Sequence, residues 1–191
     1  RVGPPRTPVA FSDALHPHLR DWRSRCGIGE VTEEEIARAR AAYWGLVDRM
    51  DRMIGQLLAA LEQNDLLNNT LIVYTSDHGE QLGEHYLVGK GHFYDGAMHI
   101  PCIVRDPHSA SDETRGRVVN SFVESVDLGP TVLDWLGVEQ PDRFQGQSLL
   151  GALYDEDDYR GKTEIHYEFD YRSSARALDP DADMDAHLLW V

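Results

Sequence analysis

The sequence predicts an α/β fold, and three features support that prediction. A long amphipathic helix is expected over residues 32–63, an apolar run follows at residues 71–75, and only a short loop joins the two. The apolar run shows no alternation, which is typical of a strand buried on both faces of a parallel sheet. A helix joined to such a strand by a short loop is half of a wound α/β unit.

The predicted helix has a defined start and one apolar face. Thr32 and Glu35 form a capping-box pattern, and the glutamates that follow Thr32 suit the positive end of the helix dipole. Apolar residues then recur at spacings of three and four, at Ile36, Tyr43, Val47, Met50, Ile54, Leu57 and Leu61. Because this period belongs to one face of a helix, we expect the helix to continue to about Gln63.

Shorter elements are expected downstream. They are a helical turn at residues 93–99, strands at 100–104, 118–123 and 163–171, a polar exposed loop at 106–117, and a short helix at 149–153. Asp127 is placed to cap a helix that has Pro130 in its first turns and stops at Gly137. We divide the chain into a connecting segment (1–31), an α/β core (32–137) and a C-terminal extension (138–191) that ends as if truncated.

Composition and charge exclude several functional classes. The chain has 191 residues, is 41% hydrophobic and carries a formal net charge of −15, so it is long enough for a packed core and repels a phosphate backbone. The acidity fits cation binding, and it also fits an ordinary solvated surface. Cys26 and Cys102 form no CxxC pair, and no apolar run is long enough to span a membrane. We expect no nucleic-acid or membrane partner and a cytoplasmic location. The chain starts with Arg1 rather than Met, so an upstream piece is expected.

The residues that could carry chemistry follow the first predicted strand. Asp77 and His78 stand at its end, Gly79 comes next, and Lys90 lies twelve residues beyond the histidine. In open α/β sheets ligands bind beyond the carboxyl ends of the strands. A carboxylate with an imidazole suits Zn, Mn or Fe, and Mg or Ca if further carboxylates join, so at least two more ligands are needed. Lys90 can neutralise an oxyanion, and His92 can share that task or donate a proton.

Less reactive roles remain open for these residues. Asp77 alone suits a turn cap, and His78 alone suits a core histidine with its hydrogen bonds satisfied. Glu84 and His85 are interpreted as partners that fix the loop, and a role for Glu80 is doubtful. From the residues alone, a metal site and these structural roles are evenly balanced.

An ordered series of motifs resembles the C-terminal half of a sulfatase in the alkaline phosphatase superfamily. The motifs are Ser-Asp-His-Gly-Glu-Gln-Leu-Gly-Glu-His at residues 76–85, Gly89-Lys90-Gly91, Tyr94, Ile100-Pro101, Val126-Asp127-Leu128, Pro130-Thr131 with Leu133, and Gly146-Gln147-Ser148-Leu149-Leu150, preceded by a helix with Asp48, Asp51, Ile54 and Gly55. The run from His166 to Arg172 looks most like the phosphonate monoester hydrolase and arylsulfatase branch. The resemblance covers about residues 32–172.

The resemblance implies a fold and a function. It implies a partial alkaline phosphatase-like core, with a mixed, mostly parallel sheet flanked by helices and a C-terminal α+β extension. It implies hydrolysis of small-molecule sulfate, phosphonate or phosphate esters with one divalent metal ion (Ca, Mn, Mg or Zn). Asp77 and His78 match the metal ligands, and Lys90 matches the residue that contacts the sulfuryl or phosphoryl group. His92 has no such counterpart, and a homo-oligomer is expected.

The resemblance also exposes an absence. The family nucleophile is a formylglycine made from cysteine in a Cys-x-Pro-x-Arg or Cys-x-Ala-x-Arg motif, and neither Cys26 nor Cys102 lies in one. We therefore expect the formylglycine, two metal aspartates and a further histidine in an N-terminal half, and we expect this chain alone to be inactive. Two alternatives remain: a phosphatase or phosphotransferase with a serine or threonine nucleophile, and a non-catalytic interaction domain on the same fold.

Overall fold

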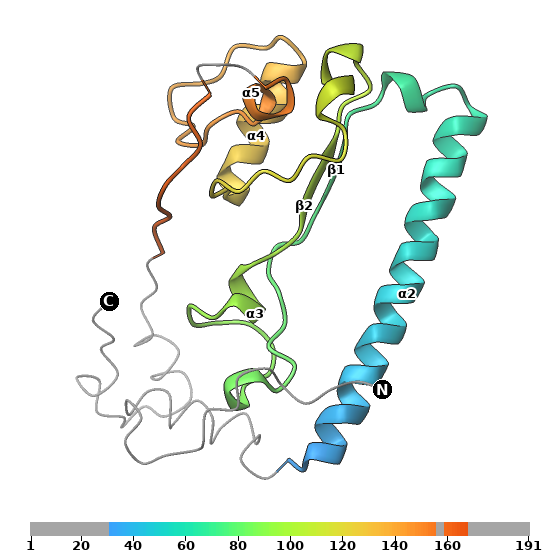
Figure 1. Cartoon of the computed structure of the whole chain (residues 1–191), viewed down its shortest axis with the longest axis vertical. Coiled ribbons are helices and arrows are strands. Elements are labelled where there is room, and N and C mark those ends of the chain that lie inside the picture. Colours follow the sequence, from blue (N-terminus) through green and yellow to red (C-terminus); the bar gives the residue numbers. More distant parts are fainter. Residues whose placement is uncertain (1–30, 156–158, 168–191) are drawn as a thin grey trace. The chain divides into compact units, whose positions relative to one another are not determined.

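The computed structural model describes residues 31–155 and 159–167 (Figure 1). Its helices and strands are α2 (Glu33–Gln63), β1 (Ile72–Thr75), α3 (Asp95–Met98), β2 (Cys102–Arg105), α4 (Leu128–Trp135) and α5 (Leu150–Leu153). Short 3₁₀ helices lie at Leu67–Asn69, Glu84–Tyr86, Ser109–Thr114 and Ser125–Asp127. The described residues form two units, which we describe separately: residues 31–56 with 78–101, and residues 57–77 with 102–155 and 159–167.

Helix α2 begins where the capping box predicted. The Thr32 backbone N–H donates to Glu35 Oε2 at 2.9 Å, and the Glu35 N–H donates to Thr32 Oγ1 at 3.3 Å. In the first unit, Arg40 Nη1 donates to the carbonyl of Leu82 at 3.3 Å, which ties the helix to the loop after β1. The predicted apolar face contains no residue that the structure buries, and Met50 on that face is 50% exposed.

Strands β1 and β2 form a two-stranded antiparallel sheet in the second unit. Ile72 pairs with Arg105 and Thr75 pairs with Cys102. Both strands lie close to their predicted positions. Within the described residues they pair antiparallel rather than in parallel, and Tyr74 of β1 is 38% exposed rather than buried. The reason is the segment His78–Pro101, which returns the chain so that β2 runs back alongside β1.

Two further strand predictions differ from the structure. Residues 118–123 form no strand and contribute one isolated bridge, in which the Phe122 N–H donates to the Lys162 carbonyl at 3.1 Å. Residues 163–167 are irregular, and the remainder of the predicted strand, 168–171, lies outside the described residues. No strand of the described chain pairs with the apolar run at 118–123, and Val118 is 77% exposed there.

The segment 106–117 is less exposed than its polar sequence predicted. It contains a 3₁₀ helix, and the side chains of Asp106 and Ser111 are 2% and 4% exposed. The Ser111 hydroxyl donates to the carbonyls of Asp106 and His108 at 3.2 and 2.8 Å. Satisfied hydrogen bonds therefore allow these two polar residues to be buried.

Helix α4 starts and ends close to prediction, but its start is not stabilised as expected. Asp127 precedes the helix, and its carboxylate makes no cap bond to it. Asp127 Oδ2 instead accepts from the backbone N–H of Glu124 at 2.8 Å, in a capping box of the preceding 3₁₀ turn. The helix ends two residues before Gly137, and α5 confirms the predicted short helix.

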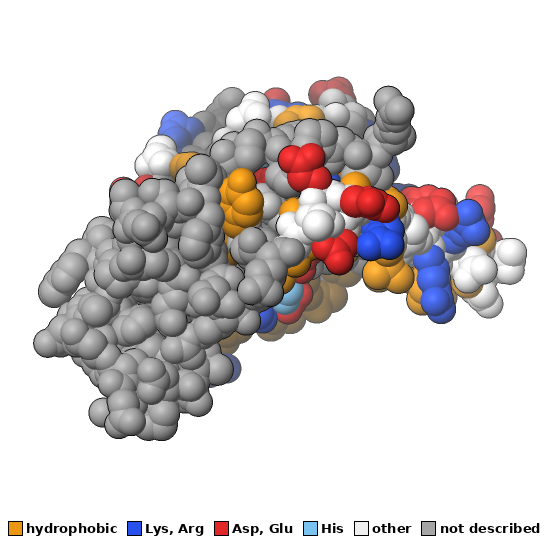
Figure 2. Space-filling model, turned by 90° about the horizontal axis from the view of Figure 1, so that it is seen from below, with side chains coloured by type: hydrophobic (Ala, Val, Ile, Leu, Met, Phe, Trp, Pro, Cys, Tyr) orange, Lys and Arg blue, Asp and Glu red, His pale blue; other side chains and the backbone are white. Residues whose placement is uncertain are grey.

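Charge on the surface is mixed in sign. On the face shown in Figure 2, acidic and basic side chains lie among exposed hydrophobic ones. The described residues on that face therefore do not form one uniformly acidic patch. Among the helices of the described residues, none has the length and apolar character needed to cross a bilayer.

Candidate functional site

The segment after β1 forms a glycine-rich loop, residues 78–91, in the first unit. Its start is fixed against α3, because the Gly79 N–H donates to the carbonyl of Ala97 at 2.8 Å. A Cβ added at Gly79 would lie 2.1 Å from the carbonyl oxygen of Gly96, so no larger residue fits without movement of the backbone. This close approach sets the direction in which the chain leaves His78.

Two side chains hold the far end of the glycine-rich loop. Glu80 Oε1 accepts from the backbone N–H groups of Gly89 at 2.6 Å and Leu82 at 3.1 Å. The Gln81 N–H donates to the Gly89 carbonyl at 3.0 Å, and Gln81 Nε2 donates to the Gly91 carbonyl at 3.4 Å. Gln81 is 1% exposed, so these bonds are made inside the loop.

Lys90 stands between Gly89 and Gly91, and the backbone at both of these positions has a conformation that favours glycine. Gly89 has φ +71° and Gly91 has φ +108°, which L-residues with a side chain seldom adopt. Lys90 itself is exposed. Within the described part of the chain, its ammonium group makes no hydrogen bond or ion pair, so all three of its N–H donors remain for an external acceptor.

Asp77 and His78 follow β1 directly, as the sequence predicted. The boundary between the two units falls between them, so Asp77 belongs with the sheet and His78 with the glycine-rich loop. The Asp77 side chain is exposed, and His78 is partly buried. His78 Nδ1 lies 2.7 Å from the carbonyl oxygen of Gly79. A carbonyl only accepts, so Nδ1 carries the proton and the neutral ring has its lone pair at Nε2.

These donors fit a divalent metal only in part. A carboxylate and an imidazole with its lone pair at Nε2 are suitable ligands, and the backbone bond at Nδ1 is the kind that orients metal-binding histidines. Nowhere in the described residues do three or more His, Cys, Asp or Glu side chains gather in a way that could hold a metal. A metal bound by Asp77 and His78 would therefore need further ligands from outside the described residues.

Two further histidines, His85 and His92, have their rings near that of Tyr94. His85 stacks on Tyr94, with ring centroids 3.8 Å apart and an interplanar angle of 12°. This contact agrees with a loop-fixing role for His85. His92 is 4% exposed, and its ring centroid lies 6.3 Å from that of Tyr94. The predicted proton-donor role of His92 therefore lacks surface access in this conformation.

Sequence reasoning missed a partly buried ion-pair cluster in the second unit, with Asp127 at its buried centre. Lys162 Nζ lies 2.8 Å from Asp127 Oδ1 and 2.6 Å from Glu124 Oε2, and Asp127 Oδ1 also accepts from the Gln147 N–H at 2.8 Å. Burial alone would raise the pKa of Asp127, but the bonds from Lys162, Glu124 and Gln147 hold it below its ordinary value. Burial opposes the charge of Lys162 as well, yet its two carboxylate partners raise its pKa.

Asp106 is a second buried carboxylate with several donors. Its oxygens accept from Trp135 Nε1 at 2.9 Å, from the Tyr154 hydroxyl at 2.6 Å and from the His108 N–H at 3.1 Å. Burial would raise the pKa of Asp106, but the hydrogen bonds from Tyr154, Trp135 and His108 keep it below the ordinary value. The partners lie up to 48 residues away in sequence, so no local pattern indicated them.

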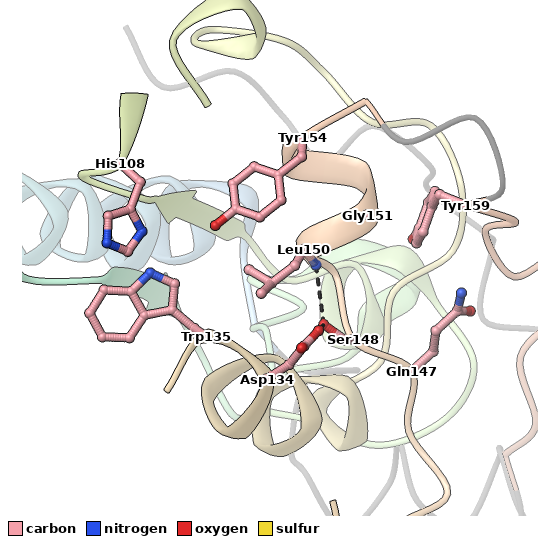
Figure 3. Close-up of a pocket in the computed structure, with 9 residues that line it drawn as sticks. All are labelled: His108, Asp134, Trp135, Gln147, Ser148, Leu150, Gly151, Tyr154 and Tyr159. Carbon is pink, nitrogen blue, oxygen red and sulfur yellow. Dashed lines mark hydrogen bonds between the residues drawn. The ribbon is translucent and has the colours of Figure 1, made fainter. Parts of the chain in front are cut away.

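The second unit also contains a cavity of about 610 Å³ (Figure 3). It is lined by His108, Asp134, Trp135, Gln147, Ser148, Leu150, Gly151, Tyr154 and Tyr159. The Ser148 hydroxyl donates to Asp134 Oδ2 at 2.5 Å, and the Leu150 N–H donates to Ser148 Oγ at 3.3 Å. The lining contains a carboxylate and neither lysine nor arginine, so the cavity is a poor site for an anionic ester group.

Known structures define the class of this fold. The phosphonate monoester hydrolase SpPMH from Silicibacter pomeroyi matches with a TM-score of 0.70 at 38% identity, and the match covers 82% of this chain and 33% of that one. The fold is therefore that of the alkaline phosphatase-like hydrolases. A profile of the sulfatase family matches residues 7–138. The chain belongs to the sulfatase family.

Two sequence relatives agree with this assignment. The multifunctional alkaline phosphatase superfamily protein PehA of Trinickia caryophylli is 40% identical over 147 residues, which are 76% of this chain and 28% of PehA. An arylsulfatase of Clostridium perfringens is 31% identical over 170 residues, which are 83% of this chain and 35% of that protein. The chain thus spans between a quarter and two fifths of the length of these relatives.

Proposed function

We propose that this chain forms part of the active site of a metal-dependent hydrolase of sulfate, phosphonate or phosphate esters. Asp77 and His78 are two of its metal ligands, and Lys90 contacts the charged group of the ester. The nucleophile, expected as a formylglycine, is proposed to come from residues outside this chain. Membership of the sulfatase family supports the reaction class. The name of the arylsulfatase supports sulfate esters, and that of the phosphonate monoester hydrolase SpPMH supports phosphonate esters.

One observation carries the assignment of the residues. The turn that presents Lys90 is hydrogen-bonded to Glu80 and Gln81, the second and third residues after His78. A cation with unused donors is therefore held close in the chain to an imidazole whose lone pair lies at Nε2. That combination suits the sulfuryl or phosphoryl group of an ester, because a cation can neutralise its anionic oxygens while a metal would bind one of them.

Each residue has a separate task in the proposed reaction. A bound divalent metal supplies Lewis-acid polarisation and a template for the nucleophile. Asp77 offers an anionic oxygen and His78 a neutral nitrogen, so the pair reduces the metal charge by one. Lys90 stabilises the negative charge that develops on the sulfuryl or phosphoryl oxygens and on the leaving oxygen. The cavity of Figure 3 takes no part, because its lining lacks a cation.

Metal content and turnover of the full-length protein test the proposal. We expect Asp77→Ala and His78→Ala to lower metal occupancy and to reduce hydrolysis of aryl sulfates and phosphonate diesters by roughly 100-fold or more. The matched controls are Asp112→Ala and His99→Ala, which remove exposed side chains of the same types. Elemental analysis and initial rates provide the two readouts.

The outcomes separate the alternatives. Normal metal content and normal rates in both variants would contradict the ligand assignment. A full-length protein that binds no divalent ion and hydrolyses no ester would favour a non-catalytic interaction domain. Turnover without formylglycine would favour the serine or threonine alternative, while Asp77 and His78 could still be ligands.

A further inference from the structure

We propose that Glu80 is a positioning residue that fixes Lys90 for its contact with the ester, an inference that rests on the proposed function of Lys90. The carboxylate of Glu80 makes two hydrogen bonds, and both come from backbone N–H groups of its own loop, those of Leu82 and Gly89. Its effect on the reaction would therefore pass through the lysine.

A lysine between two glycines needs an external restraint. Glycine loses more conformational freedom on ordering than any other residue, so fixing two glycines in one turn has a high entropic cost. Gly89 and Gly91 supply the positive φ angles of the turn, but they have no side chains with which to hold it. Without hydrogen bonds from elsewhere in the loop, the direction of Lys90 would be poorly defined.

Glu80 supplies the shortest of these restraints. Its Oε1 accepts from the Gly89 N–H at 2.6 Å, while the Gln81 contacts to Gly89 and Gly91 measure 3.0 and 3.4 Å. A bond from a backbone amide to a carboxylate is assisted by charge and stronger than one between neutral groups. The same oxygen accepts from the Leu82 N–H, so one carboxylate joins the turn at Gly89 to the part of the loop that follows His78.

The chemistry of the contact predicts how substitutions rank. Glutamine keeps an acceptor oxygen at the same reach but lacks the negative charge, so Glu80→Gln should retain the turn with a weaker bond. Alanine removes the acceptor and leaves two backbone N–H groups without it. Glu84 lies in the same loop and is also a carboxylate, but its side chain makes no hydrogen bond within the described residues, so Glu84→Ala is the matched control.

A double-mutant cycle in the full-length enzyme tests the inference. With Lys90 present, we expect Glu80→Ala to lower kcat by roughly 10- to 100-fold, since a small misplacement of a catalytic group has effects of this size. Glu80→Gln should recover a large part of the loss, and Glu84→Ala should retain the parental rate. In the Lys90→Ala background, Glu80→Ala should lower kcat by less than about threefold, because the ammonium group that Glu80 positions is absent.

The possible results are distinguishable. Two results contradict the positioning role and leave the proposed function standing, provided that Lys90→Ala is strongly impaired. In the first, Glu80→Ala is fully active; in the second, Glu80→Ala lowers kcat by the same factor with and without Lys90. If Lys90→Ala is fully active, the assigned role of Lys90 fails, and the inference fails with it. Should Glu80→Ala not fold, Glu80→Gln takes its place in the cycle, and a loss of kcat that is equal with and without Lys90 overturns the positioning role.

Discussion

Lys90 in the glycine-rich loop and Asp127 in the second unit are charged residues in opposite situations. Lys90 is exposed and bonded to nothing in the described chain, while Asp127 is 1% exposed and accepts from Glu124, Gln147 and Lys162. The bonds hold the pKa of Asp127 below its ordinary value even though burial opposes them. One residue keeps its bonding capacity for a ligand, and the other uses its capacity on the fold.

This contrast matters because a perturbed pKa is often used to find functional sites. In this chain the criterion selects Asp106 and Asp127, whose oxygens are occupied by donors from the protein. A metal or substrate would have to displace those donors and leave them unsatisfied in a buried place, which costs free energy. Unused donors, rather than a shifted pKa, distinguish Lys90 from these two buried carboxylates within the described residues.

The largest effect on stability is expected at the Asp127 cluster. Asp127→Ala removes the acceptor for two backbone N–H groups and one of the two carboxylates that pair with the partly buried Lys162. Loss of one partner of a buried pair typically costs about 3–5 kcal/mol of unfolding free energy. Chemical denaturation followed by circular dichroism measures the change.

A surface aspartate provides the control for that measurement. Asp112 pairs with Arg115 at 2.7 Å, but both side chains are largely exposed. Asp112→Ala should therefore change the unfolding free energy by less than about 1 kcal/mol. Equal losses for Asp127→Ala and Asp112→Ala would show that the buried network contributes no more than a surface pair.

The sequence predicted the local features of this molecule better than the distant ones. The capping box at Thr32 located α2, and the end of the apolar run located Asp77 and His78, because each signal lies within a few residues. The pairing of Lys162 with Asp127 joins residues 35 apart, and no periodicity encodes it. The antiparallel pairing of β1 with β2 likewise depends on how the whole segment His78–Pro101 folds back.

The glycine-rich loop lies between these extremes. Its glycines and charged residues suggested an anion site, but the sequence did not show that Glu80 would bond to Gly89 nine positions later. The loop has two glutamates, Glu80 and Glu84, and only the folded backbone decides which of them reaches the turn. The sequence leaves a role for Glu80 doubtful and favours Glu84 and His85 as the residues that fix the loop, whereas in the structure Glu80 holds the turn.

Acidification should lower the free energy of unfolding that the carboxylates of Asp106 and Asp127 contribute. This loss should be smaller than the loss caused by substituting the residues. The pKa values of Asp106 and Asp127 are lowered from 3.8, so their stabilising effect is complete above about that pH and is lost as the pH falls further through the folded-state values. The pKa of Lys162 is raised from 10.5, so its contribution is present below that pH and is lost as the pH rises through its folded-state value. Stability contributed by these groups should therefore be flat between these limits.

Unfolding midpoints measured from pH 2 to pH 7 test the expected fall in stability at low pH. The fall should be shallower in Asp127→Asn, because this variant lacks one of the carboxyl groups whose pKa is lowered by folding. A fall of the same slope in the parent and in Asp127→Asn would assign the pH dependence to other carboxylates, such as Glu35, whose pKa is also lowered by its bonds to Thr32.

The smallest effect on stability is expected at Lys90. Its side chain is exposed and makes no bond within the described chain, so Lys90→Ala should alter the unfolding free energy by no more than about 0.5 kcal/mol. The same variant should lose most of its hydrolytic activity if Lys90 stabilises the oxyanion. Unchanged stability together with lost activity is expected of a residue that contributes to the reaction and makes no stabilising contact in the fold. If Lys90→Ala instead destabilised the protein as much as Asp127→Ala, the ammonium group would have a partner in the folded protein, and the contrast between the two regions would fail.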